Sequence, residues 1–397
     1  NLCEACNIEC IETVTQNLAY TNNATYIGSG KLLELVELCN LLDVDYVVFN
    51  DELSPAELSN LADQIPCEIM DRTMLILEIF KTRAKTKEAM LQVEIANLNY
   101  MLPRLIGARK NLSRIGGGGG GGAGARRGAG ETKLELDRRY IENRIYKLKQ
   151  ELEDVVLSRQ TSRKSRTKNE VKTVAFVGYT NAGKSSTINS ILNYVEGDVE
   201  KQVFVKDMLF ATLETSTRRI KLANNHEFLI TDTVGFVNKL PHHLVESFKS
   251  TLEEIKEASL IVHLIDSSSP YIDLQIETTI NVLDKLHCSS IPVVYVFNKV
   301  DLVTNEIFIP TSYTPSLRIS NKTSKGIKEL ITYIEEHLFP DDVTTTLLIP
   351  YTNGEVYNVL MEKANVHETI YLENGTKVVV TLSKYLYELY KKYEYNE

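Results

Sequence analysis

The sequence predicts an α/β protein made of four successive parts, and three observations lead to this prediction. Short apolar runs alternate with helical patterns in residues 1–71 and again in residues 171–340, which is typical of parallel sheets covered by helices. Two long stripes of helical spacing flank a glycine tract within residues 72–170, which indicates a helical hairpin. Residues 341–397 combine two helical patterns with a strand–turn–strand pattern, which predicts a small α+β domain. Its turn should be of type I′ at residues 373–376, because Asn374-Gly375 tolerates the two positive φ angles that this turn requires.

The N-terminal α/β part shows clear strand and helix signals. We expect strands at Thr25–Ile27, Asp45–Phe49 and Cys67–Met70, and a helix at Lys31–Leu42. A second helix should begin at Ser54–Glu57, because serine can cap the free N–H groups, proline fits the first turn, and glutamate can bond back to the cap. These elements predict a small parallel sheet covered by helices.

The apolar residues of the long helical hairpin fall on two stripes. We expect one helix from Arg72 to about Gly107 and a second from about Thr132 to Gln160, followed by a polar, basic linker at residues 158–172. The two stripes should pack on each other in an antiparallel arrangement. They consist of Leu91, Ile95, Leu98 and Leu102 in the first helix, and Leu134, Ile141, Ile145, Leu148 and Leu152 in the second.

Between these helices, residues 116–130 open with seven consecutive glycines and also contain Arg126 and Arg127. Glycine loses the most backbone entropy when it becomes ordered, so we expect this loop to be mobile when the protein is alone. A flexible linker would explain the composition. The two arginines at the tip of a basic hairpin favour a contact with a polyanion instead.

The charge of the chain is distributed unevenly. The formal net charge is −9, but residues 81–173 hold 22 Lys and Arg against 10 Asp and Glu, while the remainder holds 22 against 43. Such asymmetry indicates that a polyanion docks on one part of the protein. A solvated helical face is the simpler alternative.

Composition also bears on the compartment. No stretch approaches the roughly 18 apolar residues of a membrane span. Six widely scattered cysteines do not form a disulfide framework, and the cluster of Cys3, Cys6 and Cys10 lacks a nearby fourth ligand for a metal site. We therefore expect a cytoplasmic protein, monomeric in solution, with no membrane partner.

A phosphate-binding loop follows the apolar strand Thr173–Val177. Residues 178–185 match the pattern G-x-x-x-x-G-K-S and lead into a helix, which is the context this loop requires. Lys184 should neutralise the β- and γ-phosphates, and Ser185 should ligate Mg²⁺. Residues 28–31 resemble this loop only superficially, and we interpret them as a strand-to-helix turn. The expected nucleotide contacts are Gly178, Tyr179, Thr180, Asn181, Ala182, Gly183, Lys184, Ser185 and Ser186.

Three further segments follow apolar strands in the order that a guanine-nucleotide site requires. Asp232 can hold Mg²⁺ through water, and the Gly235 N–H can contact the γ-phosphate. The Asp301 carboxylate can accept hydrogen bonds from the ring N–H and the exocyclic amine of guanine, which adenine would leave unpaired. These segments and the supporting base loop add Asp232, Thr233, Val234 and Gly235, then Asn298, Lys299, Val300 and Asp301, then Ser320, Asn321 and Lys322.

The segment between the first two motifs should act as a switch. Thr212 is the expected second Mg²⁺-binding hydroxyl, with Thr215 and Thr217 as competitors. Together the motifs predict a P-loop GTPase domain that uses GTP, GDP and Mg²⁺, with Lys184, Thr212 and Gly235 closest to the chemistry. The switch residues are Phe210, Ala211, Thr212, Leu213 and Glu214.

With these motifs in place, residues 26–340 resemble the HflX family of GTPases. The glycine-rich hairpin makes the resemblance specific, although the family's usual Gly-Thr-Arg-Gly-Pro-Gly-Glu run reads Gly-Ala-Arg-Arg-Gly-Ala-Gly-Glu here. In addition, Asn321 replaces a usual alanine, which we expect to be without consequence because that position acts through its backbone. The segments that carry the resemblance are residues 26–31, 51–55, 92–105, 130–139, 210–214 and 232–236.

The resemblance implies a GTPase that binds the large ribosomal subunit and, in some members, separates stalled ribosomes into subunits. It also implies contacts between the hairpin and ribosomal RNA, for which Arg114, Arg126 and Arg127 are the candidates. An RNA-modifying or ribosome-assembly factor gated by GTP is the alternative. An RNA-modifying enzyme would need a separate catalytic centre, and we find no nucleophile or metal cluster for one outside the GTPase motifs.

Two residues bear on the hydrolysis rate. Phe236 stands where Ras-like GTPases have a water-orienting glutamine, so basal hydrolysis should be slow. In related GTPases, an asparagine in the place of Asn181 can hold K⁺ beside the phosphates. A plain hydrogen bond within the loop explains Asn181 equally well.

Overall fold

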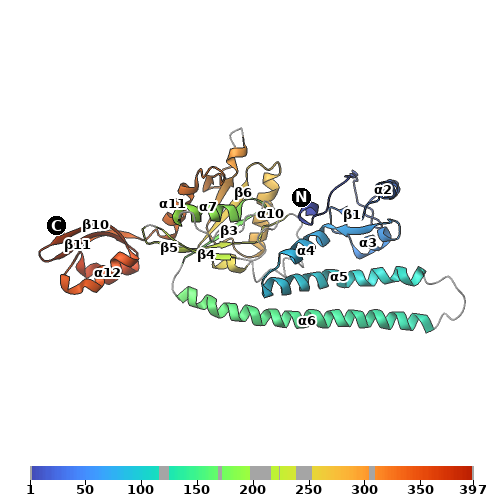
Figure 1. The fold of residues 1–397 in the computed structure, drawn as a ribbon, viewed down its shortest axis with the longest axis horizontal. Coiled ribbons are helices and arrows are strands. Elements are labelled where there is room, and N and C mark those ends of the chain that lie inside the picture. The colour runs from blue at the N-terminus through green and yellow to red at the C-terminus, as the bar shows by residue number, and fades with distance from the viewer. Residues whose placement is uncertain are drawn as a thin grey trace. The chain divides into compact units, whose positions relative to one another are not determined.

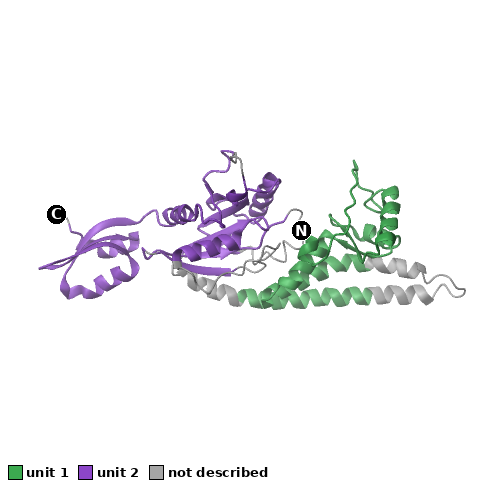
Figure 2. Ribbon diagram, turned by 45° about the horizontal axis from the view of Figure 1, so that its top comes forward, with its two compact units in different colours: residues 1–164, 208–214, 238–250 green, residues 165–207, 215–237, 251–397 purple. Residues whose placement is uncertain are grey.

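The computed structural model divides into two compact units (Figure 2). The first comprises residues 1–164, 208–214 and 238–250, and the second comprises residues 165–207, 215–237 and 251–397. The described backbone covers residues 2–115, 125–168, 172–196, 216–222, 224–237, 253–303 and 309–395, without the side chains of residues 106–134, 158–171 and 196.

The N-terminal part contains a two-stranded parallel sheet, in which Tyr46 pairs with Glu68 at the start of the register. The expected capping box is confirmed, with Ser54 and Glu57 bonding to each other's backbone. The strand expected at residues 25–27 is wrong: Tyr26 makes only an isolated bridge and has a φ of +63°, so the chain turns there into the next helix. The elements are α1 (Leu2–Ala5), α2 (Ser29–Leu42), β1 (Tyr46–Phe49), α3 (Pro55–Ala62) and β2 (Glu68–Asp71).

The hairpin helices α5 (Lys87–Ile115) and α6 (Ala125–Lys168) run side by side in opposite directions (Figure 1). The two apolar stripes meet as predicted, around the buried side chains of Leu91, Ile95, Ile145 and Leu148. Leu134 lies outside the described side chains.

Three expectations for this region are wrong. The helix expected from Arg72 is two helices, because α4 (Arg72–Arg83) ends where Ala84 turns extended, and the Thr86 hydroxyl then caps the start of α5. The expected linker is helical as far as Lys168. The second half of the expected loop, residues 125–130, already belongs to α6, whereas the glycine tract at residues 116–124 lies outside the described residues.

The central part forms a six-stranded sheet in the order β4-β5-β3-β6-β7-β8, covered by helices on both faces (Figure 1). Only β4 is antiparallel to its neighbour. One apolar core joins the sheet to α7 and α11, and others join the opposite face to α10. Parallel strands end at one edge, so the loops after β3, β5, β7 and β8 come together there. The elements are β3 (Thr173–Gly178), α7 (Lys184–Glu196), β4 (Ser216–Lys221), β5 (Glu227–Asp232), η1 (Glu253–Glu257), β6 (Leu260–Asp266), α10 (Ile272–Lys285), β7 (Val293–Asn298), η2 (Val300–Leu302), β8 (Ser316–Arg318) and α11 (Ile327–Leu338).

The C-terminal part is a three-stranded antiparallel sheet in the order β10-β11-β9 with short helices. The expected hairpin is confirmed, but its turn differs. Leu372 pairs with Gly375, so Glu373 and Asn374 form the turn, and of these residues only Gly375 has a positive φ. The elements are β9 (Val343–Ile349), α12 (Gly354–Lys363), β10 (Asn365–Leu372), β11 (Gly375–Leu382) and α13 (Lys384–Tyr390). Among the residues described in both units, no helix combines the length and the apolar character of a membrane span.

Candidate nucleotide site

The phosphate loop leaves the buried strand β3 and enters α7, as the sequence pattern predicts. Gly183 has a φ of +93°, and a Cβ atom at this position would lie 2.3 Å from Nδ2 of Asn298. Glycine alone fits such a close approach without displacing a neighbour. Asn181 also has a positive φ, +63°, which asparagine tolerates better than most residues.

Lys184 lies inside the loop and is only 6% exposed. Its Nζ atom donates to the carbonyl oxygens of Gly178 (3.1 Å) and Tyr179 (3.0 Å). Burial lowers the pKa of Lys184 to about 8, and the nearby Asp232 carboxylate opposes part of that shift. An ammonium group held within this loop can neutralise phosphate oxygens.

Ser185 and Asp232 bring two hard oxygen ligands together beside the lysine. The Ser185 hydroxyl donates to Oδ2 of Asp232 over 2.7 Å, and Asp232 is fully buried at the end of β5. A hydroxyl and a carboxylate suit Mg²⁺, so this pair fits the ion that the sequence predicts. Thr212 lies outside the described residues, as do its expected companions Phe210, Ala211, Leu213 and Glu214. Of the competing threonines, Thr217 lies in β4 with its hydroxyl 3.4 Å from that of Thr231.

The segment after β5 lies directly on the phosphate loop. The Thr180 N–H donates to the Phe236 carbonyl (2.7 Å), and the Phe236 N–H donates to the Gly178 carbonyl (3.1 Å). A Cβ atom on Gly235 would approach Thr180 within 2.8 Å and Nζ of Lys184 within 3.0 Å. The Gly235 backbone can therefore approach the phosphate site as the sequence predicts. The Phe236 ring is buried in the core on the α10 face of the sheet and offers no group to a water molecule.

The base side of the site is formed after β7 and β8. The Asp301 carboxylate is exposed and accepts a hydrogen bond from the buried Ser320 hydroxyl over 2.6 Å, which is the main cause that lowers the pKa of Asp301. Lys299, with a φ of +62°, makes an ion pair of 2.8 Å with Asp266. The Asp301 carboxylate is thus held in its charged form, which can accept hydrogen bonds from a base edge that carries several donors. Asp266, the partner of Lys299, is a residue that sequence reasoning missed.

The expectation that Asn321 acts only through its backbone is wrong. Its side-chain amide donates to the Thr187 hydroxyl (2.9 Å) and to the Gly183 carbonyl (3.3 Å). Thr187 is a second residue that sequence reasoning missed. The asparagine at position 321, where the family resemblance leads us to expect alanine, was the sequence feature that could have indicated this contact.

Other expected residues lie where the motifs place them or outside the described part. Val234 is buried beside the phosphate loop, Val300 begins η2, and Lys322 is exposed on the base loop. The candidate RNA-binding arginines of the hairpin are Arg114 in α5 and Arg126 and Arg127 in α6. Only their backbone belongs to the described part of the structure.

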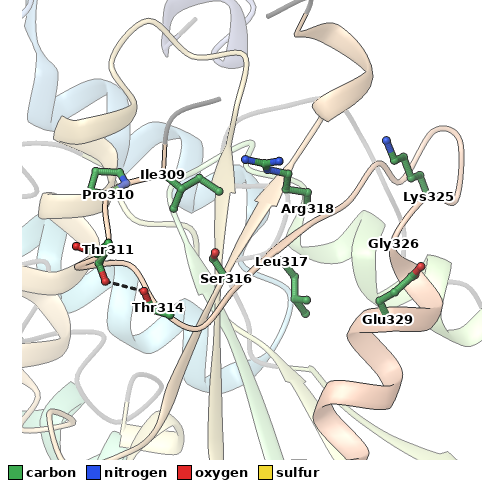
Figure 3. Close-up of a pocket in the computed structure, with 10 residues that line it drawn as sticks. All are labelled: Ile309, Pro310, Thr311, Thr314, Ser316, Leu317, Arg318, Lys325, Gly326 and Glu329. Atoms are coloured by element: carbon green, nitrogen blue, oxygen red, sulfur yellow. Dashed lines mark hydrogen bonds between the residues drawn. The ribbon is translucent and has the colours of Figure 1, made fainter. Parts of the chain in front are cut away.

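A separate pocket of about 840 Å³ lies along the edge strand β8 (Figure 3). Its lining includes the apolar side chain of Ile309 and the charged side chains of Arg318, Lys325 and Glu329. None of the residues predicted to contact the nucleotide lines it, so it is distinct from the nucleotide site.

Comparison with protein families and known proteins identifies matches along most of the chain. Family models described as "GTP-binding GTPase N-terminal", "GTP-binding GTPase Middle Region" and "50S ribosome-binding GTPase" match residues 1–81, 83–166 and 173–299, respectively. A protein named GTPase HflX from Caldanaerobacter subterraneus subsp. tengcongensis is 43% identical over 370 residues, which cover 93% of this chain and 83% of that protein. One of the same name from Escherichia coli (strain K12) is 36% identical over 362 residues, covering 90% and 82%.

A solved structure described as a GTP-binding protein from the hyperthermophilic archaeon Sulfolobus solfataricus in complex with GDP also matches. It is 23% identical, covers 85% of this chain and 93% of its own, and has a TM-score of 0.44. The relationship to a protein family rests on the curated relatives, whose identity and coverage are much higher.

Proposed function

Because this chain belongs to the HflX family of GTPases, we propose that it binds the large ribosomal subunit and rescues or separates stalled ribosomes. The chain is a GTP hydrolase, and in this proposal GTP binding and hydrolysis act as the switch. The observation that carries the GTP switch in this proposal is the gathering of Lys184, the Ser185–Asp232 pair and Asp301 at one edge of the sheet. The ribosomal partner is supported by the family model described as a 50S ribosome-binding GTPase.

We assign the phosphate contacts to the loop at residues 178–186 and the charge neutralisation to Lys184. Ser185 and Asp232 would hold Mg²⁺, the latter through water, with Thr212 as a further ligand. When bound, Mg²⁺ supplies positive charge beside the β- and γ-phosphates. Asp301 reads the guanine edge, and Ser320 holds its carboxylate in place.

Hydrolysis without a partner should be slow. A side chain that orients the attacking water contributes strongly in GTPases of this type, and the buried Phe236 ring cannot do so. The large subunit, by binding at the switch segments, would supply the missing groups. Asn181 can add a K⁺ ion, whose charge would stabilise the transition state.

The hairpin is the proposed RNA-binding element. Residues 81–173 carry the excess of basic residues in an otherwise acidic chain. Arg114, Arg126 and Arg127 would contact ribosomal RNA phosphates, since phosphate contacts dominate the affinity of proteins for nucleic acids. The alternative of an RNA-modifying or assembly factor shares this surface but would not require release of stalled ribosomes.

The activity proposal is tested by measuring GTP hydrolysis with and without purified ribosomal subunits. We expect a low basal rate, a clear increase with large subunits, and little change with small subunits. Ser185→Ala is the control that should abolish hydrolysis in all samples. A high basal rate that large subunits do not alter would contradict the proposal.

The hairpin proposal is tested with Arg126→Ala combined with Arg127→Ala. A phosphate contact releases counterions from the RNA, so a variant that lacks two such contacts releases fewer of them on binding. Binding to large subunits should therefore weaken, and its salt dependence should flatten by roughly one contact per arginine. GTP affinity should stay at the wild-type value, because these residues lie outside the nucleotide-binding segments. Unchanged affinity and salt slope would show that the tip is only a linker.

A further inference from the structure

We propose that Asn321 is a positioning residue that ties the base-binding loop to the phosphate loop and thereby slows nucleotide release. The inference rests on the proposed nucleotide site, in which the two loops hold opposite ends of GTP or GDP. Alanine, which the family resemblance leads us to expect at position 321, could not make this contact.

The contact joins two segments that are far apart in the sequence. Asn321 follows β8, and its amide nitrogen donates to the Thr187 hydroxyl in the first turn of α7 over 2.9 Å. The same nitrogen lies 3.3 Å from the Gly183 carbonyl, which also accepts hydrogen bonds from the Thr187 N–H and hydroxyl, each over 2.8 Å. A single side-chain amide thus binds both the loop and the helix that follows it.

A second asparagine strengthens the interpretation. Asn298, at the end of β7, donates to the Ala182 carbonyl over 2.9 Å. The two asparagines therefore hold consecutive carbonyl groups of the phosphate loop, at residues 182 and 183. Thr187 and Asn298 are almost fully buried, so these hydrogen bonds are shielded from competing water.

This arrangement has a consequence for a bound nucleotide. The base and the phosphates are held by loops from different strands, and release requires that at least one loop moves away. A bond between the loops makes that movement less favourable, because the Asn321 amide would lose both of its acceptors and the buried Thr187 hydroxyl would lose its donor. A protein with alanine at position 321 lacks this bond, so its base-binding loop can separate from the phosphate loop more easily.

The test measures the dissociation rate of a fluorescent GDP analogue from the full chain. Asn321→Ala and Thr187→Val should each accelerate release about three- to tenfold, the effect of one lost hydrogen bond. The double variant should release GDP little faster than the faster single variant, because both substitutions remove the bond between Asn321 and Thr187 and differ only in the bond that each side chain also makes to the Gly183 carbonyl. Thr187→Ser, which keeps the hydroxyl, should restore slow release.

Matched controls separate this role from a general loss of stability. Asn60→Ala removes a similar side-chain bond in the N-terminal part, to the Ala24 carbonyl, and should leave release unchanged. Equal release rates for Asn321→Ala and the wild type would overturn the proposal, as would effects that multiply in the double variant. If Asn321→Ala fails to fold, the comparison of Thr187→Val with Thr187→Ser still decides. Failure of the wild type to bind GDP at all would instead contradict the nucleotide site itself.

Discussion

Replacing Asp301 with asparagine should weaken GTP binding by about a hundredfold and create binding of xanthosine triphosphate. In the proposed site, the carboxylate accepts two hydrogen bonds, from the ring N–H and the exocyclic amine of guanine. A hydrogen bond to a charged group contributes about tenfold or more in affinity. Asparagine loses the bond from the exocyclic amine, leaves that amine facing another donor, and keeps only a weaker, uncharged bond from the ring N–H, so we expect a loss of about a hundredfold. We use the lower end because the Asp301 carboxylate is exposed to water in the free protein.

Xanthine carries an oxygen where guanine has the amine, so the asparagine amide can donate to it. The Ser320 hydroxyl, 2.6 Å from the Asp301 carboxylate, can equally donate to the asparagine oxygen and keep the side chain in place. The assay is a titration of the wild type and the variant with fluorescent guanosine and xanthosine nucleotides. Glu329→Gln, which removes a nearby carboxylate in the β8 pocket, is the matched control and should bind GTP as the wild type does. Unchanged GTP affinity of Asp301→Asn would refute the assignment of the base-reading residue.

Three further predictions concern the buried charges and the loop. Burial lowers the pKa of Lys184 to about 8, so the Lys184 amine of the nucleotide-free protein is mostly neutral near pH 9. Bound phosphates favour its charged ammonium form. GDP binding should therefore take up most of one proton near pH 9 but little near pH 7, and the affinity for GDP should fall as the pH rises through 8. Calorimetry in buffers of different ionisation enthalpy measures this proton uptake. Equal uptake at pH 7 and pH 9 would contradict the prediction. Hydrolysis should be faster in K⁺ than in Na⁺ buffer if Asn181 helps to hold the ion, whereas equal rates would indicate a plain loop hydrogen bond. Arg104→Ala should lower the free energy of unfolding in urea by about 3 kcal/mol, because it leaves the fully buried Asp71 without its cationic partner 3.6 Å away; a loss below about 1 kcal/mol would contradict this.

Local motifs predicted the phosphate and base loops well because their geometry follows from a few neighbouring residues. A strand followed by G-x-x-x-x-G-K-S can form little else, and Lys184 and Ser185 lie where this pattern puts them. The Ser54–Glu57 helix start is local for the same reason, since both of its bonds are made within four residues.

The features that sequence reasoning missed are ones that no short sequence pattern marks. The role of the Asn321 side chain requires Thr187, 134 residues earlier in the chain, to lie beside it. The helix break at Ala84 has no proline or glycine to mark it, so helical periodicity alone predicts one continuous helix. The turn at Glu373 and Asn374 depends on the register with which β10 and β11 pair, which the Asn-Gly pattern does not determine.

Nucleotide-dependent binding to the large ribosomal subunit tests the central claim most directly. The protein is sedimented with purified large or small subunits in the presence of a non-hydrolysable GTP analogue or of GDP. We expect it to sediment with large subunits when the GTP analogue is bound, to bind them more weakly with GDP, and to stay in the supernatant with small subunits. Equal sedimentation with both subunits, or binding to large subunits that does not depend on the nucleotide, would contradict the account.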